Sequence, residues 1–211
     1  MVDRDRDRDP SRPRLWVALA GAVVVCVAVL GLAVLLDAGG PAGHDGVALP
    51  SGSVVLMRHT ATDTSQTDAD PTARGSCAQQ RNLSAAGVAQ ARAIGEAIGA
   101  RDVAVDAVLA SPFCRTVDTA VALGLGEVEA TDLLLSLTAA PDRRTADWLV
   151  AEATRLIEVH LGGDDIAVMV THTQNIEALT GELVEEGGAV VLTAGEGGAL
   201  AVGGVIAPDD W

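Results

Sequence analysis

The chain has 211 residues, of which 49% are hydrophobic, and its fourteen Arg residues stand against twenty-nine Asp and Glu residues without a single Lys. The net charge of −15 argues against a nucleic-acid-binding protein, because neutralising phosphates requires clustered cations. The hydrophobic content excludes a mainly disordered chain, and three Cys are too few for a disulfide-rich scaffold. A mean hydropathy of +0.32 is unusual for so acidic a protein, so the apolar residues must be concentrated somewhere.

Residues 15–36 are the most apolar part of the chain and carry no charge. A helix of this length reaches roughly 33 Å, enough to cross a hydrocarbon core of about 30 Å. A cleaved signal peptide is the alternative, but this apolar run is long, and residues 37–41 (DAGGP) contain no convincing small-x-small cleavage motif. The sequence therefore favours one retained N-terminal transmembrane helix.

The placement of Arg predicts the orientation of this helix. Five Arg lie within residues 1–14, an Arg/Asp-rich tail, whereas none lies between Asp37 and Met57. Because cytoplasmic flanks are enriched in positive charge, we expect the tail in the cytoplasm and the remainder outside it, in the periplasm or the extracellular space. Residues 37–52 are predicted to be a tether, followed by a folded domain at 53–211. From Asp37 onward nine Arg face twenty-five acidic residues, a net charge of −16.

Strand and helix patterns alternate along this domain. Short apolar runs rich in β-branched residues indicate buried strands, and apolar residues at helical spacing indicate helices. In chain order we predict a strand at 53–57, a helix at 84–100 capped by Ser84, a strand at 105–110, helices at 112–123 and 143–161, a strand at 166–170 and a helix at 173–180. Two strands at 189–193 and 199–206, around a Gly-rich turn, close the chain. The alternation predicts an α/β fold, a three-layer sandwich with a mainly parallel sheet flanked by helices.

Three predicted strands end in residues suited to phosphate chemistry. Arg58 and His59 follow the first strand, Arg115 lies shortly after the second, and His172 follows the third. Ligands of parallel sheets bind beyond the carboxyl ends of the strands, so neighbouring strands would bring these four side chains together. Arg matches phosphate oxygens and stays charged, a neutral His can attack phosphorus, and a protonated His can hold an oxygen. The alternative is that these are unrelated, solvated side chains. That three strands all end in Arg or His residues argues against this alternative.

The segments VVLMRHT, CAQQRNLSAAGVAQARAIG, VLASPFCRTVDTA and VMVTHTQNIEALTG occur in this order over residues 53–206. Together they resemble the histidine phosphatase superfamily of phosphoglycerate mutases and acid phosphatases. The resemblance is closest to small periplasmic or anchored members such as the lipopolysaccharide core heptose phosphate phosphatase-like group. It implies that His59 is a nucleophile that becomes phosphohistidine, that Arg58, Arg115 and His172 hold the phosphoryl oxygens, and that water then releases phosphate from the phosphoenzyme.

The expected activity is hydrolysis of small phosphomonoesters without a metal or other cofactor. The sequence has no carboxylate or Cys/His cluster with metal-ligand spacing, and it lacks the Lys of a nucleotide-binding phosphate loop. The strong negative charge should repel polyanions at long range. Expected partners are a small phosphorylated substrate and the membrane, through residues 15–36, but no nucleic acid. The resemblance further implies Arg81 and Asn82, in QQRNLS, as candidates for lining the pocket.

The sequence departs from the family pattern in two places. The usual Arg-His-Gly reads Arg-His-Thr here, so the backbone at Thr60 must accept a β-branched residue. The general acid that protonates the leaving group is also not identifiable, and losing it would cost roughly 10²–10⁴ in rate for poor leaving groups. The alternative function is therefore a non-catalytic module that retains the pocket and binds phosphate or a phosphorylated ligand. Carboxylates that could be the acid, each equally suited to the surface, are Asp63, Glu127, Glu129, Asp132 and Asp142.

The three Cys divide between the two parts of the chain. Cys26 lies in the apolar span, where it suits packing as a small apolar residue. Cys77 and Cys114 lie in the domain expected outside the cytoplasm, near the predicted pocket. An oxidising location would allow a Cys77–Cys114 disulfide, and two buried free thiols are the alternative.

Overall fold

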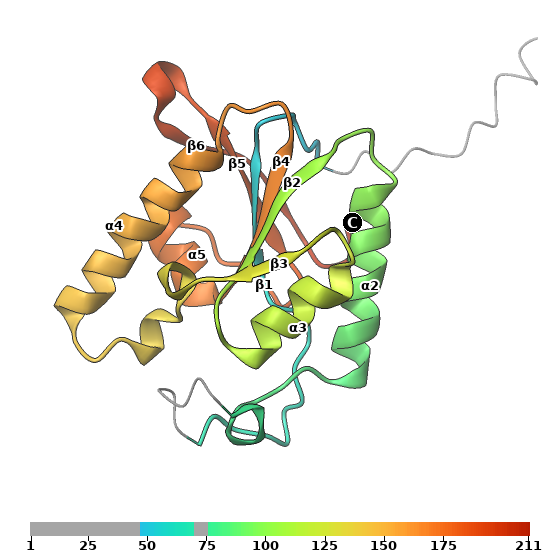
Figure 1. Ribbon diagram of the computed structural model, residues 1–211, viewed down its shortest axis with the longest axis vertical. Helices are drawn as coiled ribbons and strands as arrows, with labels where there is room; N and C mark the ends of the chain where they lie inside the picture. The colour runs from blue at the N-terminus through green and yellow to red at the C-terminus, as the bar shows by residue number, and fades with distance from the viewer. Residues whose placement is uncertain (1–46, 70–75) are drawn as a thin grey trace, which may run out of the picture. The chain divides into compact units, whose positions relative to one another are not determined.

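The computed structural model describes residues 47–69 and 76–211 (Figure 1). The predicted cytoplasmic tail, the transmembrane helix and most of the tether lie outside the described residues, so their prediction stands as made. Within the described ranges, no helix is long and apolar enough to span a bilayer.

A six-stranded mixed sheet forms the centre of the domain, with the strand order β3-β2-β4-β1-β5-β6. The pairs β3–β2, β2–β4 and β4–β1 are parallel, whereas β5 pairs antiparallel with both β1 and β6. The prediction of a mainly parallel sheet fits β1 to β4, and the last two strands, predicted on either side of a Gly-rich turn, pair antiparallel. Only residues 195–199 join those two strands, too few for the crossover that parallel pairing needs. The strands are β1 (Val54–Arg58), β2 (Val105–Ala110), β3 (Val128–Ala130), which was not predicted, β4 (Ile166–Thr171), β5 (Ala189–Ala194) and β6 (Leu200–Ile206).

Helices cover both faces of the sheet, as Figure 1 shows, and complete the predicted three-layer sandwich. On one face, Ile94 and Leu123 pack on Val55 of β1. On the other face, Ile157 and Ile176 belong to the second core cluster. The helices of the first face are α2 (Ala85–Gly99) and α3 (Cys114–Leu123), and those of the second are α4 (Arg143–His160) and α5 (Thr173–Thr180). Four short 3-10 turns complete the elements: η1 (Cys77–Gln79), η2 (Asp132–Leu134), η3 (Leu137–Ala139) and η4 (Glu196–Gly198).

The ends of the helices follow local chemistry. The Ser84 hydroxyl accepts a hydrogen bond from the Gly87 amide at 3.0 Å, which makes Ser84 the predicted N-cap of α2. α3, however, begins at Cys114 and not at Pro112, because Phe113 keeps an extended backbone with ψ 141° while its carbonyl accepts the first helical bonds. The prediction at this end was therefore two residues too early.

Gly87 allows α2 to approach the segment that follows β1. A Cβ atom at this position would overlap the carbonyl of Ala61, so only glycine permits this packing. Because Ala61 lies two residues after His59, the contact helps to fix the chain at the end of β1.

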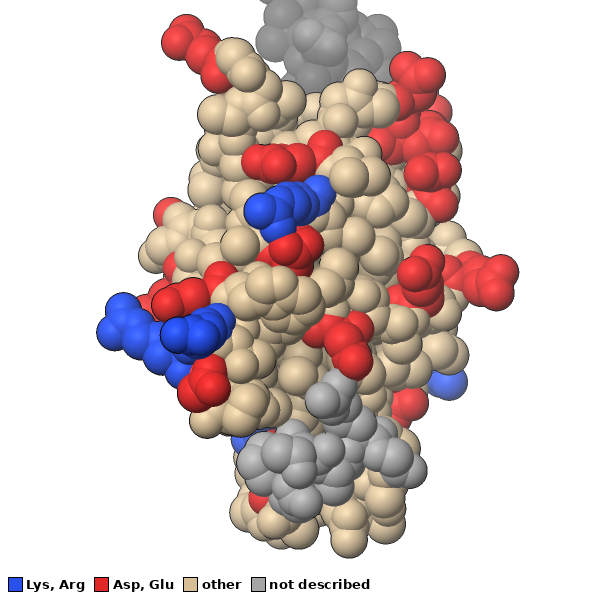
Figure 2. Space-filling view, turned by 60° about the vertical axis from the view of Figure 1, so that its left-hand side comes forward, with Lys and Arg blue, Asp and Glu red and all other residues tan. Residues whose placement is uncertain are grey.

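The surface agrees with the acidic composition. On the face that Figure 2 shows, Asp and Glu side chains are scattered widely, whereas Arg side chains occupy only a few places. Cations gathered inside a cavity of such a domain are therefore a specific feature and not a consequence of a basic surface.

Candidate active site

The carboxyl ends of β1, β2 and β4 meet at one edge of the sheet because these strands are parallel neighbours. The pairing continues past the strands: the His59 amide donates to the carbonyl of Thr171 at 3.1 Å, and the Ser111 amide donates to that of Val170 at 2.9 Å. At this edge lies a cavity of about 140 Å³. The structure brings all four predicted residues to it, namely Arg58, His59, Arg115 and His172.

His59 is buried and is oriented by the backbone. Its Nδ1 lies 3.0 Å from the carbonyl oxygen of Thr60. A carbonyl only accepts, so Nδ1 carries the proton and Nε2 keeps its lone pair. Burial is the main cause that lowers the pKa of His59 to about 4; the Thr60 carbonyl opposes this shift, and the charges of Arg115 and Arg58 add to it. The imidazole is therefore neutral at neutral pH, the state that a nucleophile needs.

His172 lies beside His59, with 5.6 Å between the ring centroids. Its Nε2 contacts the Ser111 hydroxyl at 2.9 Å, and its ring packs edge-on against Phe113. Burial, followed by the positive charge of Arg115, lowers the pKa of His172 well below its ordinary value. The imidazole is thus neutral in the free protein, and only a nearby anion would favour the protonated form that the sequence suggested.

Three guanidinium groups line the same cavity, those of Arg58, Arg81 and Arg115. Arg58 donates from Nη1 to the carbonyl of Val184 at 3.0 Å, and Arg115 stacks on Phe113 with 4.5 Å to the ring centroid. The Nε atoms of all three Arg are buried, and within the described part of the chain none has a hydrogen-bond partner. Buried donors of this kind fit an anion that brings several acceptor oxygens.

Asn82, which the sequence offered as a pocket candidate together with Arg81, does not line the cavity. Its Nδ2 donates to the carbonyls of Cys77 and Gln80 at 2.8 and 2.9 Å, and these bonds hold the loop before α2 together.

The Cys77–Cys114 disulfide, one of the two alternatives that the sequence left open, is formed. It ties this loop to the first residue of α3, directly before Arg115.

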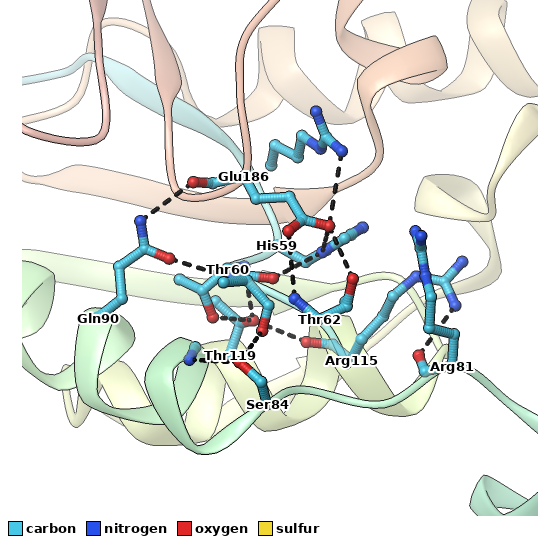
Figure 3. Close-up of polar contacts among 12 residues, drawn as sticks. His59, Thr60, Thr62, Arg81, Ser84, Gln90, Arg115, Thr119 and Glu186 are labelled. Atoms are coloured by element: carbon cyan, nitrogen blue, oxygen red, sulfur yellow. Dashed lines mark hydrogen bonds and ion pairs between the residues drawn. The ribbon is translucent and has the colours of Figure 1, made fainter. Parts of the chain in front are cut away.

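Thr60 fits where the family pattern has glycine. Its backbone does not need the left-handed region, since every described residue with positive φ is a glycine. Both its amide and its hydroxyl lie 3.1 Å from the Thr119 hydroxyl on α3, as Figure 3 shows. The Thr119 hydroxyl in turn donates to the carbonyl of Arg115 at 2.7 Å. Thr60 therefore links the segment that follows β1 to α3.

Glu186, in the loop before β5, was missed by sequence reasoning. Its carboxylate accepts hydrogen bonds from the hydroxyl and the amide of Thr62 at 2.8 and 3.2 Å, and it lies 3.6 Å from Nη2 of Arg58. Figure 3 shows it next to His59, whose Nδ1 is 4.0 Å away. Burial opposes the charge of Glu186, but the bonds from Thr62 and the nearby His59 and Arg58 lower its pKa. No local pattern in the sequence around Glu186 signals this contact.

Asp68 was also missed, and it is the carboxylate that lines the cavity among the described residues. Its Oδ1 accepts from Nη1 of Arg115 at 3.0 Å and from the amide of Arg81 at 2.9 Å. The sequence offered no signal for it, because Asp68 lies in an Asp-rich, irregular stretch where every acid resembles a solvated one.

The five carboxylates proposed from the sequence do not line this cavity, which corrects that expectation. Asp63 is tied to Ser65 and Gln66 in its own turn, and Asp142 caps α4 by accepting from the Thr145 amide. The remaining three lie on or next to β3 and η2 and are Glu127, Glu129 and Asp132.

The outer wall of the cavity comes from the segment around η3. Ser136 and Thr138 line the cavity, and Asn175 on α5 holds this segment by donating to the Leu135 carbonyl at 2.8 Å and accepting from the Leu137 amide. Asn175 is buried, so this support is built into the α5 face of the domain.

Comparison with known proteins agrees with this geometry. Residues 54–134 match the family model of the histidine phosphatase superfamily (branch 1), a segment that carries Arg58, His59 and Arg115. Over these residues the chain is similar to the histidine phosphatase superfamily. Its likeness to the lipopolysaccharide core heptose phosphate phosphatase-like group remains a prediction. A search among curated proteins found no match.

Similar solved structures show the same fold. The protein histidine phosphatase SixA complexed with tungstate is 17% identical, with a TM-score of 0.55, over 75% of this chain and 98% of SixA. The mycobacterial glucosyl-3-phosphoglycerate phosphatase complexed with VO3 is 21% identical, with a TM-score of 0.54, over 74% of this chain and all of that one. At these identities the likeness establishes the fold.

Proposed function

We propose that this protein hydrolyses small phosphomonoesters through a phosphohistidine on His59. The observation that carries the proposal is the state of that residue: a buried, neutral imidazole whose Nδ1 is bound by the Thr60 carbonyl, so that Nε2 is the free nucleophile. The cavity around it is lined by Arg58, Arg81 and Arg115, whose charge is opposite to that of a phosphoryl group.

The reaction proceeds in two displacements. Nε2 of His59 attacks phosphorus, the bond from phosphorus to the ester oxygen breaks, and that oxygen takes up a proton as the alcohol leaves. A water molecule then attacks the phosphohistidine, the phosphorus–nitrogen bond breaks, and inorganic phosphate departs. The guanidinium groups of Arg58 and Arg115 stabilise the charge that develops on the phosphoryl oxygens.

The test is turnover of p-nitrophenyl phosphate by the full chain in mild detergent, with EDTA present because the proposed steps use no metal. We expect turnover and an acid-labile phosphoenzyme. His59→Ala should abolish both, whereas His160→Ala, at the far end of α4, should abolish neither. Phosphate binding without turnover would instead support the non-catalytic binding module.

The cavity volume and the charge of the domain favour a small substrate. The cavity of about 140 Å³ is small, and the acidic surface repels extended polyanions. SixA and the mycobacterial phosphatase are named for different substrates, phosphohistidine and glucosyl-3-phosphoglycerate. The proposed class is therefore phosphomonoesters with a compact leaving group.

We further propose that the protein is anchored in the membrane by residues 15–36, with the catalytic domain outside the cytoplasm. The uncharged span and the Arg-rich tail support this orientation. The Cys77–Cys114 disulfide also favours an oxidising compartment. An alkaline phosphatase reporter fused after Asp37 should be active, and an inactive reporter would contradict the orientation.

A further inference from the structure

We infer that Asp68 is the general acid of the proposed phosphatase reaction, donating the proton that the leaving oxygen takes up. The inference rests on the proposed function and adds the residue that the sequence did not identify. It starts from position: among the described residues, Asp68 is the carboxylate that lines the cavity together with His59. Its side chain is 28% exposed, so it reaches both the cavity and the solvent.

Arg115 connects Asp68 to the reacting centre. The guanidinium of Arg115 bonds the Asp68 carboxylate, with 3.0 and 3.3 Å from Nη1 to its two oxygens. The same guanidinium lies close enough to His59 to lower the pKa of that imidazole. A phosphoryl group held by Arg115 in this cavity would therefore lie near both the nucleophile and the carboxylate, since both line it.

Glu186 is the other carboxylate near His59, and it fits a supporting role. It lies on the Nδ1 side of the imidazole, at 4.0 Å, whereas the phosphoryl group bonds to Nε2. Its two oxygens already accept hydrogen bonds from Thr62. The leaving oxygen departs on the side of phosphorus opposite to Nε2, so Glu186 is on the wrong side of the ring to protonate it.

The proton balance closes with Asp68 and the solvent. In the free protein, Arg115 pairs with the Asp68 carboxylate. A bound phosphoryl group competes for that guanidinium, and the carboxylate, which reaches the solvent, takes up one proton from water. Asp68 then gives this proton to the leaving oxygen and becomes a carboxylate. In the second displacement it accepts a proton from the attacking water, and this proton returns to the solvent when phosphate leaves.

The experiment compares two leaving groups in the full chain. p-Nitrophenolate leaves without protonation, whereas the alkoxide of β-glycerophosphate needs a proton. We expect Asp68→Asn to lower kcat/KM for β-glycerophosphate by roughly 10²–10⁴-fold and to change that for p-nitrophenyl phosphate by less than about tenfold. Asp63→Asn, the same change at an acid of the same loop that does not line the cavity, should leave both values unaltered.

Further readouts separate acid catalysis from positioning of Arg115. Asp68→Glu retains a proton donor and should recover part of the β-glycerophosphate activity. The alkaline limb of kcat for this substrate, present in the wild type, should be lost in Asp68→Asn. Equal losses on both substrates, or no loss on either, would overturn the inference while leaving the phosphatase function intact. A wild-type protein inactive on both substrates would instead overturn the proposed function itself.

Discussion

Nδ1 of His59 and the carbonyl oxygen of Thr60 lie 3.0 Å apart, between adjacent residues at the end of β1. The contact fixes the tautomer of the imidazole, because the carbonyl can only accept. The orientation of the nucleophile therefore depends on the backbone of the next residue, which is itself held by Thr119 on α3. The hydrogen bonds that stabilise this segment therefore also orient the imidazole of His59.

The first prediction concerns the titration of His59. Since burial and the nearby Arg lower its pKa to about 4, the ring stays neutral as the pH falls through 6.5, where an exposed His is half protonated. The imidazole signal that disappears in His59→Ala should titrate near pH 4 in the NMR spectrum of the folded chain. The same signal in urea should titrate near its ordinary value. A folded-state midpoint near 6.5 would contradict this environment.

Glu186→Gln should weaken substrate binding. The amide oxygen can still accept one of the two hydrogen bonds from Thr62, but its NH2 group cannot accept the other, and the negative charge beside Arg58 and His59 is removed. Loss of one partly exposed ion pair should raise KM for p-nitrophenyl phosphate roughly two- to fivefold. Glu186 also raises the pKa of His59, so the His59 titration should move to lower pH. Glu177→Gln, an exposed acid on α5, is the matched control, and an unchanged KM and titration in Glu186→Gln would exclude this role.

Thr119→Val should destabilise the protein although it preserves the shape of the side chain. The substitution leaves the buried Thr60 amide without its acceptor and removes the donor to the Arg115 carbonyl. The expected loss is about 1–3 kcal/mol in the free energy of unfolding, measured with urea and circular dichroism. Thr154→Val on α4 removes a half-buried bond to the Val150 carbonyl and should cost less. Equal losses in the two variants would mean that the Thr60 contact has no special weight.

The disulfide should stabilise both the fold and the cavity. Cys77 and Cys114 are 37 residues apart, and closing a loop of that size in the unfolded chain is worth about 4 kcal/mol in the chain-entropy model. The double change Cys77→Ser and Cys114→Ser should therefore lower the melting temperature. KM should also rise, because the bridge ties the loop carrying Asp68 and Arg81 to α3. Cys26→Ser should have neither effect, and a double variant that melts like the wild type would refute the prediction.

Local signals in the sequence account for most of the fold. β1 and β4 are apolar on both faces, as expected for central strands between two helical layers, and Ser84 and the glycines after α4 mark helix ends. The same signals missed β3, which is only three residues long. The pairing of β5 with β1 depends on which neighbour the strand meets in space, and that is not a periodic feature of the chain.

Arg58, His59, Arg115 and His172 could be placed at one edge from the sequence because each lies at or shortly after the carboxyl end of a strand, and parallel strands bring such ends together. The acidic composition also made clear that cations in this domain would be specific. The partners of these residues were decided only by the tertiary structure. Asp68 and Glu186 come from irregular loops in a chain with twenty-nine acidic residues. Loop position depends on long-range contacts such as the disulfide and the bonds of Thr62, so which carboxylate meets which arginine is a property of the folded chain.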